Sequence, residues 1–443
     1  MQPSGHIQSC IELLSEFKGQ SAPFKRFHKS FFKSRRYAGS KDRRAIFHMA
    51  MQIFRHYYNL NRMINACGLD INERSLVIAY LYLVENKDIN DLKLLFVPPY
   101  GPKPLSINEQ QALSMLSHKE AIEYSLELPD FILPSMIKQQ GEVILSCFAH
   151  MAQNILKPYF RINPHKGEYF DICEQLIADD MPIILPDEDD DITLRPLPYL
   201  IQTFGQETID IRNHPLYQQG LIEIQDKGSQ ILCSFIPNKP QQILWDFCGG
   251  AGGKSLYLQS ASTELKVILS DITAVKLKEA QKRFTRAGLK IPQTLLLPQD
   301  LPKPQDLKAD ILLLDVPCSG SGTWQRNADL KVRLSQQSLT EIIQTQQKII
   351  DQSIPYLKAG GQLYYMTCSL FAEENEEQVK YILKNHPKMA IKSICDINPY
   401  AHDLKQRAKS KGYVKEENSP FLKIYPNVEN CDGFFLAILE KEK

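Results

Sequence analysis

The stretch Asp246–Ser255, DFCGGAGGKS, decides the fold of the C-terminal half of the chain. It follows an apolar run, Ile243–Phe247 (ILWDF), that predicts a strand, and we expect it to open a helix. Glycines at such a junction let backbone N–H groups approach a ligand, and a helix N-terminus favours negative charge. About twenty residues later Asp271 ends a second strand, where a carboxylate can accept both hydroxyls of a ribose. The stretch therefore predicts a nucleotide-type loop on an α/β sheet.

Three ligand classes compete for this loop. A phosphate-binding P-loop requires glycine at position 248, where this chain has Cys248. A dinucleotide-binding loop requires G-x-G-x-x-G, and Gly250, Gly252 and Gly253 do not provide that spacing. A nucleoside cofactor such as S-adenosylmethionine requires only the glycine turn and the ribose carboxylate. The third interpretation fits best.

Strands and helices alternate from Gln241 onward. Further apolar runs that predict strands are Val267–Asp271, Thr294–Leu297, Asp310–Asp315 and Gln362–Thr367. A capping box, Ser338-x-x-Glu341, predicts a helix that ends at Gly360–Gly361, and another helix is expected from Glu373. Apolar strands that alternate with helices predict a parallel sheet covered on both faces, with ligands bound beyond the carboxyl ends of its strands.

The preceding sequence predicts two further domains. Residues 1–128 show helical periodicity, as in Ile11–Phe17 and Ile46–Phe54, with a break at Phe96–Ser106. Residues 129–240 are mixed, with strand-like runs at Tyr159–Asn163 and Leu221–Asp226. The expected architecture is thus a helical bundle (1–128), a small α+β linker domain (129–240) and an α/β parallel-sheet domain (241–443).

Two cysteines follow neighbouring predicted strands. DVPCSGSGTWQR (Asp315–Arg326) places Cys318 after one strand, and YYMTCSLFAEEN (Tyr364–Asn375) places Cys368 after the next. If these strands are adjacent and parallel, both thiols lie at one edge of the sheet near the glycine loop. Each cysteine alone is as easily a buried spacer as a reactive group, but the pair beside a ribose-binding loop favours chemistry.

Methyl transfer to carbon-5 of cytosine explains why a thiol is needed there. That carbon is a poor nucleophile until a thiolate adds at carbon-6 and makes the ring enamine-like. The thiol's proton must first be removed or its pKa lowered. An acid such as Asp315 can protonate the ring nitrogen, and a second thiol, Cys318, can assist release of the product.

Composition limits the other possibilities. The chain of 443 residues has ten cysteines, none in a C-x-x-C pair, so we expect neither a metal site nor disulfides. No signal peptide and no apolar stretch of about 20 residues is evident, so we expect a cytosolic protein without a membrane segment.

Charge is distributed unevenly along the chain. The net charge is +1, yet basic residues interleaved with aromatic ones crowd the segment from Lys18 to Arg62. Such a segment suits a phosphate-rich partner, or it is a solvated helical face with its aromatic residues in the core, and on its own it leaves the two interpretations even. An acidic run, Asp187–Asp191, predicts an exposed loop rather than a metal site.

These segments closely resemble the Sun/RsmB-type (NOL/NOP/Sun) family of S-adenosylmethionine-dependent RNA cytosine-C5 methyltransferases. The resemblance rests on the order and spacing of several segments over the C-terminal half and, more weakly, over the whole chain. They are YFRINPHKG (Tyr159–Gly167), IQDKGSQ (Ile224–Gln230), the glycine loop, ADILLLDVPCSG, MTCSLFAEENE and CDGFFLA (Cys431–Ala437).

The resemblance implies a Rossmann-like class I methyltransferase domain and a role for each matching residue. Cys368 is the implied nucleophile and Cys318 the implied release residue, with Asp315 beside them. The implied contacts to S-adenosyl-L-methionine are Cys248, Gly249, Gly250, Ala251, Gly252, Gly253, Lys254, Asp271, Asp300 and Asp315. No metal is implied. The loop departs from the family's usual C-A-A-P-G-G-K, and NADLK after Arg326 departs from the usual NPDLR.

Methylation of one cytosine in RNA is therefore the leading hypothesis. Ribosomal RNA is preferred over transfer RNA, because the basic N-terminus resembles the helical RNA-binding domain of the family's bacterial ribosomal members. The alternatives are a transfer RNA methyltransferase, a non-catalytic RNA-binding ribosome assembly factor and a DNA cytosine methyltransferase. Intact Cys318 and Cys368 argue against the assembly factor, and the lack of an evident target-recognition domain argues against the DNA enzyme.

Overall fold

The chain divides into two compact units. The computed structural model describes residues 1–20, 22–116, 126–181, 183–184, 200–203, 211–237, 239–413 and 419–443. One unit comprises Met1–Ile155 and Thr323–Gln336, and the other comprises Leu156–Gly322 and Gln337–Lys443. The three-domain division at residues 128 and 240 stays a prediction. The acidic run at 187–191 lies outside the described residues.

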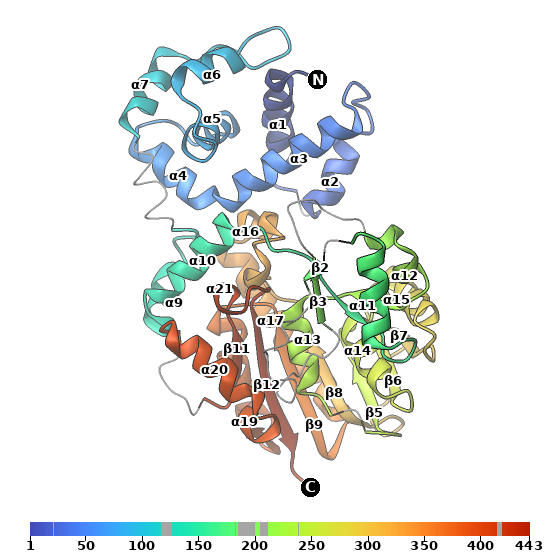
Figure 1. Ribbon diagram of the computed structural model, residues 1–443. Helices are drawn as coiled ribbons and strands as arrows, with labels where there is room; N and C mark the ends of the chain where they lie inside the picture. The colour runs from blue at the N-terminus through green and yellow to red at the C-terminus, as the bar shows by residue number, and fades with distance from the viewer. Residues whose placement is uncertain are drawn as a thin grey trace. The chain divides into compact units, whose positions relative to one another are not determined.

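The first unit is helical, as its periodicity predicts (Figure 1). Its core is rich in phenylalanine. The rings of Phe17, Phe24 and Phe54 pack against one another, with centroid distances of 4.9–5.7 Å. The predicted break at Phe96–Ser106 is confirmed. The helices are α1 (Pro3–Phe17), α2 (Phe24–Phe31), α3 (Ser40–Arg55), α4 (Tyr57–Ala66), α5 (Glu73–Leu83), α6 (Ile89–Leu95), α7 (Ile107–Met115), α9 (Leu133–Gln140), α10 (Val143–Gln153) and α16 (Ala328–Arg333).

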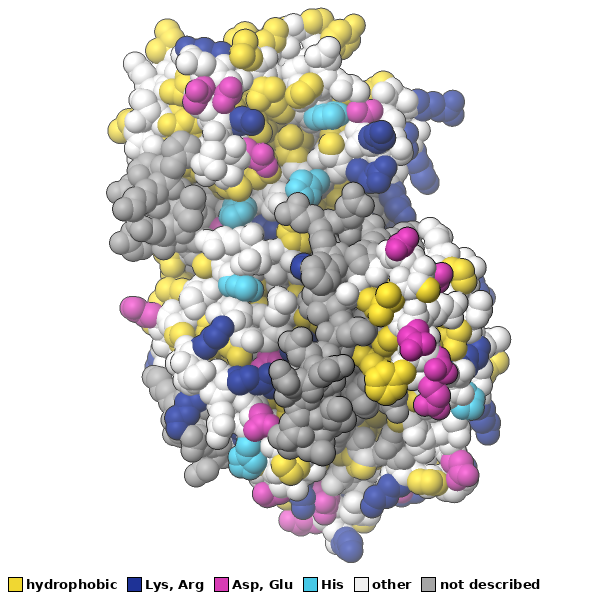
Figure 2. All heavy atoms as spheres, in the orientation of Figure 1, with side chains coloured by type: hydrophobic (Ala, Val, Ile, Leu, Met, Phe, Trp, Pro, Cys, Tyr) yellow, Lys and Arg dark blue, Asp and Glu magenta, His cyan; other side chains and the backbone are white. Residues whose placement is uncertain are grey.

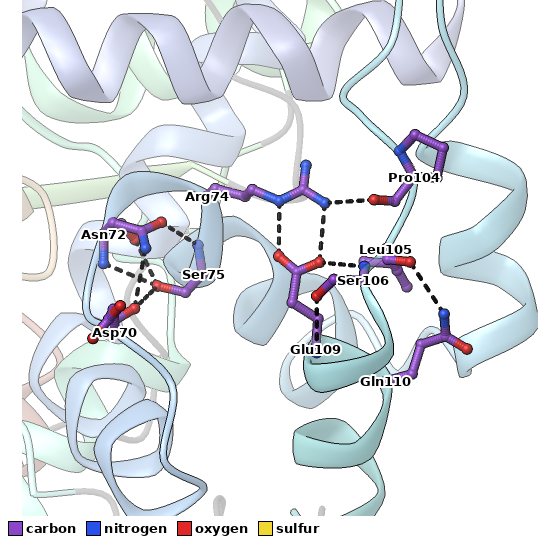
Figure 3. Close-up of polar contacts among 9 residues, drawn as sticks. All are labelled: Asp70, Asn72, Arg74, Ser75, Pro104, Leu105, Ser106, Glu109 and Gln110. Atoms are coloured by element: carbon purple, nitrogen blue, oxygen red, sulfur yellow. Dashed lines mark hydrogen bonds and ion pairs between the residues drawn. The ribbon is translucent and has the colours of Figure 1, made fainter.

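Polar contacts hold α7 against α5 across the break (Figure 3). Ser106 caps α7 through a capping box with Glu109. The carboxylate of Glu109 also accepts from Nε and Nη2 of Arg74 in α5, at 2.8 and 3.1 Å. The same guanidinium donates to the carbonyl of Pro104 at 3.2 Å. Asn72 and Ser75 cap α5 in the same reciprocal way. One charged pair thus fixes a connection that has no regular structure of its own.

The segment Thr323–Gln336 follows the Cys318 motif in sequence and packs into the helical unit. The Lys331 ammonium, 3% exposed, is paired with Glu127 at 2.6 Å and also donates to the carbonyl of Arg55. Asp329 accepts from the backbone N–H of Phe24 at 3.1 Å. A buried ion pair is costly to break, so this segment is firmly attached to the helical unit.

The second unit contains a sheet of eight strands whose order is β10-β12-β9-β8-β5-β6-β7, with β11 paired to β12 (Figure 1). Strands β7, β6, β5, β8 and β9 are mutually parallel, and β10, β11 and β12 join antiparallel. The α/β, mostly parallel fold predicted from the sequence is confirmed. The strands are β5 (Ile243–Asp246), β6 (Lys266–Asp271), β7 (Gln293–Leu296), β8 (Ala309–Asp315), β9 (Leu357–Thr367), β10 (Met389–Lys392), β11 (Leu422–Ile424) and β12 (Phe434–Lys441).

Alternate strand residues face two separate hydrophobic cores. Leu244 and Leu313 pack into one core with residues of α14 and α20, while Trp245 and Leu312 pack into the other with residues of α17 and α18. Both faces are therefore covered, as the continuous apolar strands predict. The helices of this unit are α11 (Tyr169–Ala178), α12 (Pro215–Gln218), α13 (Lys227–Ser234), α14 (Gly253–Ala261), α15 (Ala274–Arg286), α17 (Gln336–Ser353), α18 (Glu376–Asn385), α19 (Ile394–Ile397), α20 (Tyr400–Ser410) and α21 (Pro426–Glu429), with 3-10 turns η2 (Ile211–Asn213), η3 (Ser321–Thr323), η4 (Ile354–Tyr356) and η5 (Ala372–Glu374).

The predicted end of one helix is wrong. The helix expected from Ser338 to Gly360–Gly361 is α17, which begins at Gln336 and ends at Ser353. Pro355 disfavours helical backbone at the residue before it. The two glycines lie inside β9, where a Cβ at Gly361 would come within 3.0 Å of the Asp310 carbonyl oxygen. They mark a register shift against β8 rather than a helix C-cap.

A smaller antiparallel sheet of order β2-β3-β1-β4 precedes the large one in sequence. The predicted strands at 159–163 and 221–226 are confirmed as β1 (Tyr159–Ile162) and β4 (Ile222–Ile224), which pair with each other. The other two strands are β2 (Ile183–Ile184) and β3 (Leu200–Thr203). No helix among the described residues combines the length and apolar character that crossing a membrane requires.

Candidate active site

The predicted site residues follow the carboxyl ends of the parallel strands β5, β6, β7, β8 and β9. Asp246 and Asp271 end β5 and β6, Asp315 ends β8, and the loops that follow carry the glycines and both cysteines. Ligands bind at this edge of open α/β sheets because the connecting loops diverge there.

The glycine loop has backbone geometry that side chains would prevent. Gly250 and Gly252 adopt positive φ values of 55° and 74°, and Gly252 precedes the first residue of α14. A Cβ on Gly249 would lie 2.1 Å from Cδ1 of Leu269, a residue of β6. The departure from C-A-A-P-G-G-K therefore has a local cause, since Leu269 occupies the space an alanine at 249 would need and position 250 is left-handed.

Asp246, at the end of β5, is 1% exposed. Its Oδ2 accepts from the Ser255 hydroxyl at 2.7 Å, whereas its Oδ1 has no hydrogen-bond partner among the described residues. Burial raises its pKa to about 7, with the nearby charge of Asp315 adding to the shift and the Ser255 hydrogen bond opposing it. An acceptor in this state fits a ligand that brings a donor or a positive charge.

Asp271 and Asp300 serve local structure in different ways. Asp271, 7% exposed, accepts from the N–H of Thr273 at 2.8 Å, and its other oxygen lies 3.6 Å from the Lys276 ammonium. Gly250, where a Cβ would lie 3.9 Å from Asp271 Oδ2, brings the glycine loop beside this carboxylate. Asp300 is exposed and accepts from the N–H of Leu296 at 2.8 Å. Among the described residues no contact joins Asp300 to the other site residues.

Lys254 joins the glycine loop to β8. Its ammonium lies 2.5 Å from Oδ2 of Asp315 and 5.8 Å from the centre of the Phe434 ring. The lysine side chain is 11% exposed and the aspartate side chain 33% exposed. Burial lowers the pKa of Lys254, but the negative charge of Asp315 outweighs that effect, and the pKa of Lys254 is raised. The lysine is therefore charged in the folded protein.

The two predicted cysteines are in direct contact. Sγ of Cys318 lies 3.2 Å from Sγ of Cys368, and the N–H of Gly322 donates to the carbonyl of Cys368 at 2.9 Å. The parallel pairing of β8 with β9 brings their motifs together, as predicted. The pKa of the Cys318 thiol is raised, mainly by the contact with Cys368 and next by burial. Cys318 thus keeps its proton and can donate it in a hydrogen bond to the sulfur of Cys368.

Residues that the sequence did not single out connect the two cysteine loops. Ser319 and Ser369 directly follow the cysteines, and both hydroxyls donate at 2.5 Å to the same oxygen of Glu374. The N–H of Ser319 donates to the other oxygen at 2.7 Å. The only sequence pattern that could have indicated these hydrogen bonds is the serine that follows each cysteine, together with the acidic pair in FAEEN.

Residues 234–440 match a family model described as "16S rRNA methyltransferase RsmB/F". The chain is 32% identical over 293 residues to the ribosomal RNA small subunit methyltransferase B of Yersinia pseudotuberculosis, which covers 64% of this chain and 58% of that protein. It is 26% identical over 339 residues to a probable ribosomal RNA small subunit methyltransferase B of Synechocystis, covering 75% of this chain and 71% of that protein. The match to the Erwinia tasmaniensis methyltransferase B spans about half of that protein, 49%, at 29% identity.

Solved structures show the same fold. The crystal structure of PH0851 is similar over 100% of this chain and 99% of its own, with a TM-score of 0.69 and 19% identity. The structure of NSun6 from Pyrococcus horikoshii with SFG covers 72% of this chain and 100% of its own, with a TM-score of 0.58 and 16% identity. At these identities the likeness establishes the fold and no more.

Proposed function

We propose that this protein methylates carbon-5 of a cytosine in ribosomal RNA, because residues 234–440 match the family model described as "16S rRNA methyltransferase RsmB/F". The observation that carries the proposal is the 3.2 Å contact between the sulfurs of Cys318 and Cys368, at the edge of the sheet that also carries the glycine loop. Two thiols in contact at the ligand-binding edge of the sheet are what an addition and elimination on a pyrimidine ring requires.

The residues present fit S-adenosylmethionine, which supplies a methyl group on a sulfonium centre. The glycines at 249, 250, 252 and 253 let backbone N–H groups approach it, and Asp271, at the end of β6, can accept the ribose hydroxyls. The buried Oδ1 of Asp246, which has no partner in the described part of the chain, fits the cationic character of this cofactor. Lys254 provides the positive charge that a carboxylate would bind.

Cys368 is the nucleophile in this proposal. Its thiolate adds to carbon-6 of cytosine, which makes carbon-5 able to take the methyl group. The Cys318 thiol, which keeps its proton, donates a hydrogen bond to the Cys368 sulfur and so stabilises negative charge there when the thiolate attacks and again when it departs. The carbon-5 proton then passes to a base such as water, the Cys368–carbon bond breaks to return the thiolate, and the proton on the ring nitrogen goes back to the carboxylate of Asp315.

Asp315 is the acid that we assign to the ring nitrogen. In the structure its carboxylate is paired with Lys254, and this pair has to loosen before the carboxyl group can carry a proton. Lys254 then links the two halves of the reaction, because its charge acts on both the cofactor loop and the acid.

A basic edge of the helical unit supports RNA as the substrate. Figure 2 shows Lys and Arg side chains gathered over α2 and α3. The exposed cations there are Lys25, Arg26, Lys29, Lys33, Arg36, Lys41 and Arg44. Phe24, Phe31 and Phe32 are buried, so these phenylalanines form core, whereas Tyr37 is 58% exposed and, with the cations, is available to RNA.

This basic edge also favours ribosomal RNA over transfer RNA as the substrate, because it adds a second contact surface for a long RNA. The target cytosine has to leave its stack to reach a thiol, so the site should lie in an unpaired region. The paired thiols argue against a non-catalytic assembly factor, in which nothing would maintain their contact.

The test uses the full-length protein, unmodified ribosomal RNA and S-adenosylmethionine, with bisulfite sequencing as the readout. One cytosine should become resistant to conversion with the wild type and remain sensitive with Cys368→Ala, while cofactor binding persists. Cys318→Ala should accumulate a covalent protein–RNA adduct that migrates slowly on a denaturing gel, and Cys67→Ala should behave as wild type. Methylation by Cys368→Ala would remove that residue from its role.

A further inference from the structure

Glu374 is a buried carboxylate with an unusual set of partners. It lies in η5, between β9 and α18, and is 0% exposed. Its Oε1 accepts from the N–H of Ser319 at 2.7 Å and from Nε2 of Gln346 at 3.1 Å, and its Oε2 accepts from the hydroxyls of Ser319 and Ser369, each at 2.5 Å. Four donors converge on one side chain.

No cation forms an ion pair with Glu374 within the part of the chain that the structure describes. Burial raises its pKa, and the hydrogen bonds from Ser319 and Ser369 oppose that effect. A buried charge without a counter-ion is stable only where several hydrogen bonds stabilise it. The four donors therefore make it possible for the Glu374 carboxylate to be buried. Such a group costs more than a packed apolar side chain would, which points to a role beyond the core.

Three of the four donors come from the loops that carry the two cysteines, and the fourth, Gln346, lies in α17. Ser319 directly follows Cys318, and Ser369 directly follows Cys368. The two serine hydroxyls lie 3.2 Å apart, and Gln346 also donates to the carbonyl of Pro317, the residue before Cys318, at 3.0 Å. The hydroxyl of Ser321 extends the network by donating to the hydroxyl oxygen of Ser369 at 3.0 Å. The carboxylate is therefore the common acceptor through which the two loops are joined.

We propose that Glu374 is the positioning residue that holds the sulfurs of Cys318 and Cys368 in contact for methyl transfer. The inference rests on the proposed function, and it names a residue that acts through the cysteine loops without touching the substrate. Its negative charge is also among the causes that raise the pKa of Cys318, so the same group favours the protonated form of the release thiol.

Three substitutions separate the contact from the charge. Glu374→Ala removes all four acceptor contacts. Glu374→Gln keeps one oxygen for the Ser319 N–H and Gln346 and turns its amide toward the serine hydroxyls, which can rotate and accept. Glu374→Asp keeps the charge but is one methylene too short to reach both loops at once. Glu377→Gln, on the exposed side of α18 and paired with Lys380, is the matched control.

The first measurement needs no RNA. The oxidant diamide takes two electrons and two protons from a pair of thiols and leaves a disulfide, and the rate for Cys318 with Cys368 depends on how often their sulfurs meet. Peptide mapping by mass spectrometry follows that one cross-link over time. We expect it to form about tenfold or more slowly in Glu374→Ala and Glu374→Asp, at the wild-type rate in Glu377→Gln, and at that rate or faster in Glu374→Gln, in which loss of the charge favours the thiolate.

The second measurement is methyl transfer. Glu374→Ala should lower kcat by roughly 100-fold, because a misplacement of about 1 Å costs that much, and should leave KM for S-adenosylmethionine unchanged. Glu374→Gln should recover most of the lost kcat. If Glu374→Ala fails to fold, by circular dichroism and cofactor binding, then Glu374→Asp carries the comparison.

The outcomes are decisive for Glu374 whatever the substrate proves to be. Cross-linking in folded Glu374→Ala and Glu374→Asp at the wild-type rate overturns the proposal, as does unchanged kcat. If the wild type methylates no RNA yet the cross-linking rates differ as expected, then the positioning role stands and the proposed function fails.

Discussion

Asp246 provides a quantitative test of how the cofactor side of the site is built. Its pKa is raised from 3.8 to about 7 by burial, so between these values the native state retains a proton that the unfolded chain has lost. Each pKa unit corresponds to about 1.4 kcal/mol, so ionisation of Asp246 should destabilise the native state by about 4 kcal/mol. This stability is fully present below pH 3.8 and is lost as the pH rises through 7.

Asp246→Asn removes the titration and retains the hydrogen bond from Ser255, because the amide oxygen can take the place of Oδ2. The amide N–H groups then occupy the side where Oδ1 has no partner in the described part of the chain, which adds a constant penalty of about 1–3 kcal/mol. The prediction therefore concerns the slope against pH. The free energy of unfolding of Asp246→Asn relative to wild type should rise by about 4 kcal/mol between pH 4 and pH 8.

Urea unfolding at several pH values, followed by tryptophan fluorescence, measures this difference. The chain has two tryptophans, and Trp245 is 0% exposed in the second unit, so a Trp324→Phe background reports on that unit. Subtraction of the variant from the wild type removes the contributions of all other titrating groups. A difference that stays constant from pH 4 to pH 8 would show that Asp246 titrates normally, and the inferred affinity for a cationic ligand would lose its basis.

Two further predictions concern the glycine loop and the basic edge. Gly249→Ala should destabilise the second unit by about 1–3 kcal/mol, because the added methyl group clashes with Leu269. A double-mutant cycle with Leu269→Ala should show a favourable coupling of at least about 1 kcal/mol. Additive effects of the two substitutions would contradict the steric explanation. Lys33→Glu with Arg36→Glu should weaken RNA binding and flatten its salt dependence in a filter-binding assay, whereas Lys384→Glu with Lys388→Glu should not; equal loss in both pairs would indicate a nonspecific charge effect.

The structure also refines which cations of the basic edge are available. Arg35 appears in the sequence beside Arg36, but its guanidinium is paired with Glu16 and lies 3.7 Å from the centre of the Phe31 ring. Arg36 is exposed. Substitution of Arg35 would therefore change folding as well as charge, which is why the test above uses Lys33 with Arg36.

Local sequence patterns were sufficient to predict the parts of the fold that follow general rules of strand formation and strand order. The apolar runs predicted β5, β6, β8 and β9, and the rule that adjacent parallel strands end at one edge predicted the meeting of Cys318 with Cys368. The α17 boundary failed because the glycines near residue 360 suit a helix C-cap and a strand bulge equally well. Only the pairing of β9 with β8 distinguishes the two, and that pairing is not a local property.

Side-chain pairs between distant residues that no strand-pairing rule brings together could not be predicted from the sequence. Lys254 and Asp315 are 61 residues apart, and Ser319 and Glu374 are 55 apart, so neither pair has a spacing that predicts contact. Each residue matched a motif, but a motif gives a residue type and a position, not the partner. The same holds for Lys331, whose ion pair with Glu127 spans 204 residues.

The two halves of the site differ in how fully their buried carboxylates are hydrogen-bonded. On the thiol side, Glu374 has four donors and is complete in the folded protein, which suits a group that fixes geometry. On the cofactor side, Asp246 has one oxygen without a partner among the described residues and a raised pKa, which costs stability. A satisfied carboxylate gains nothing from a ligand, whereas an unsatisfied one gains a partner and recovers the cost of its burial. The cofactor side is therefore where binding energy is available, and the thiol side is where rigidity is needed before the base arrives.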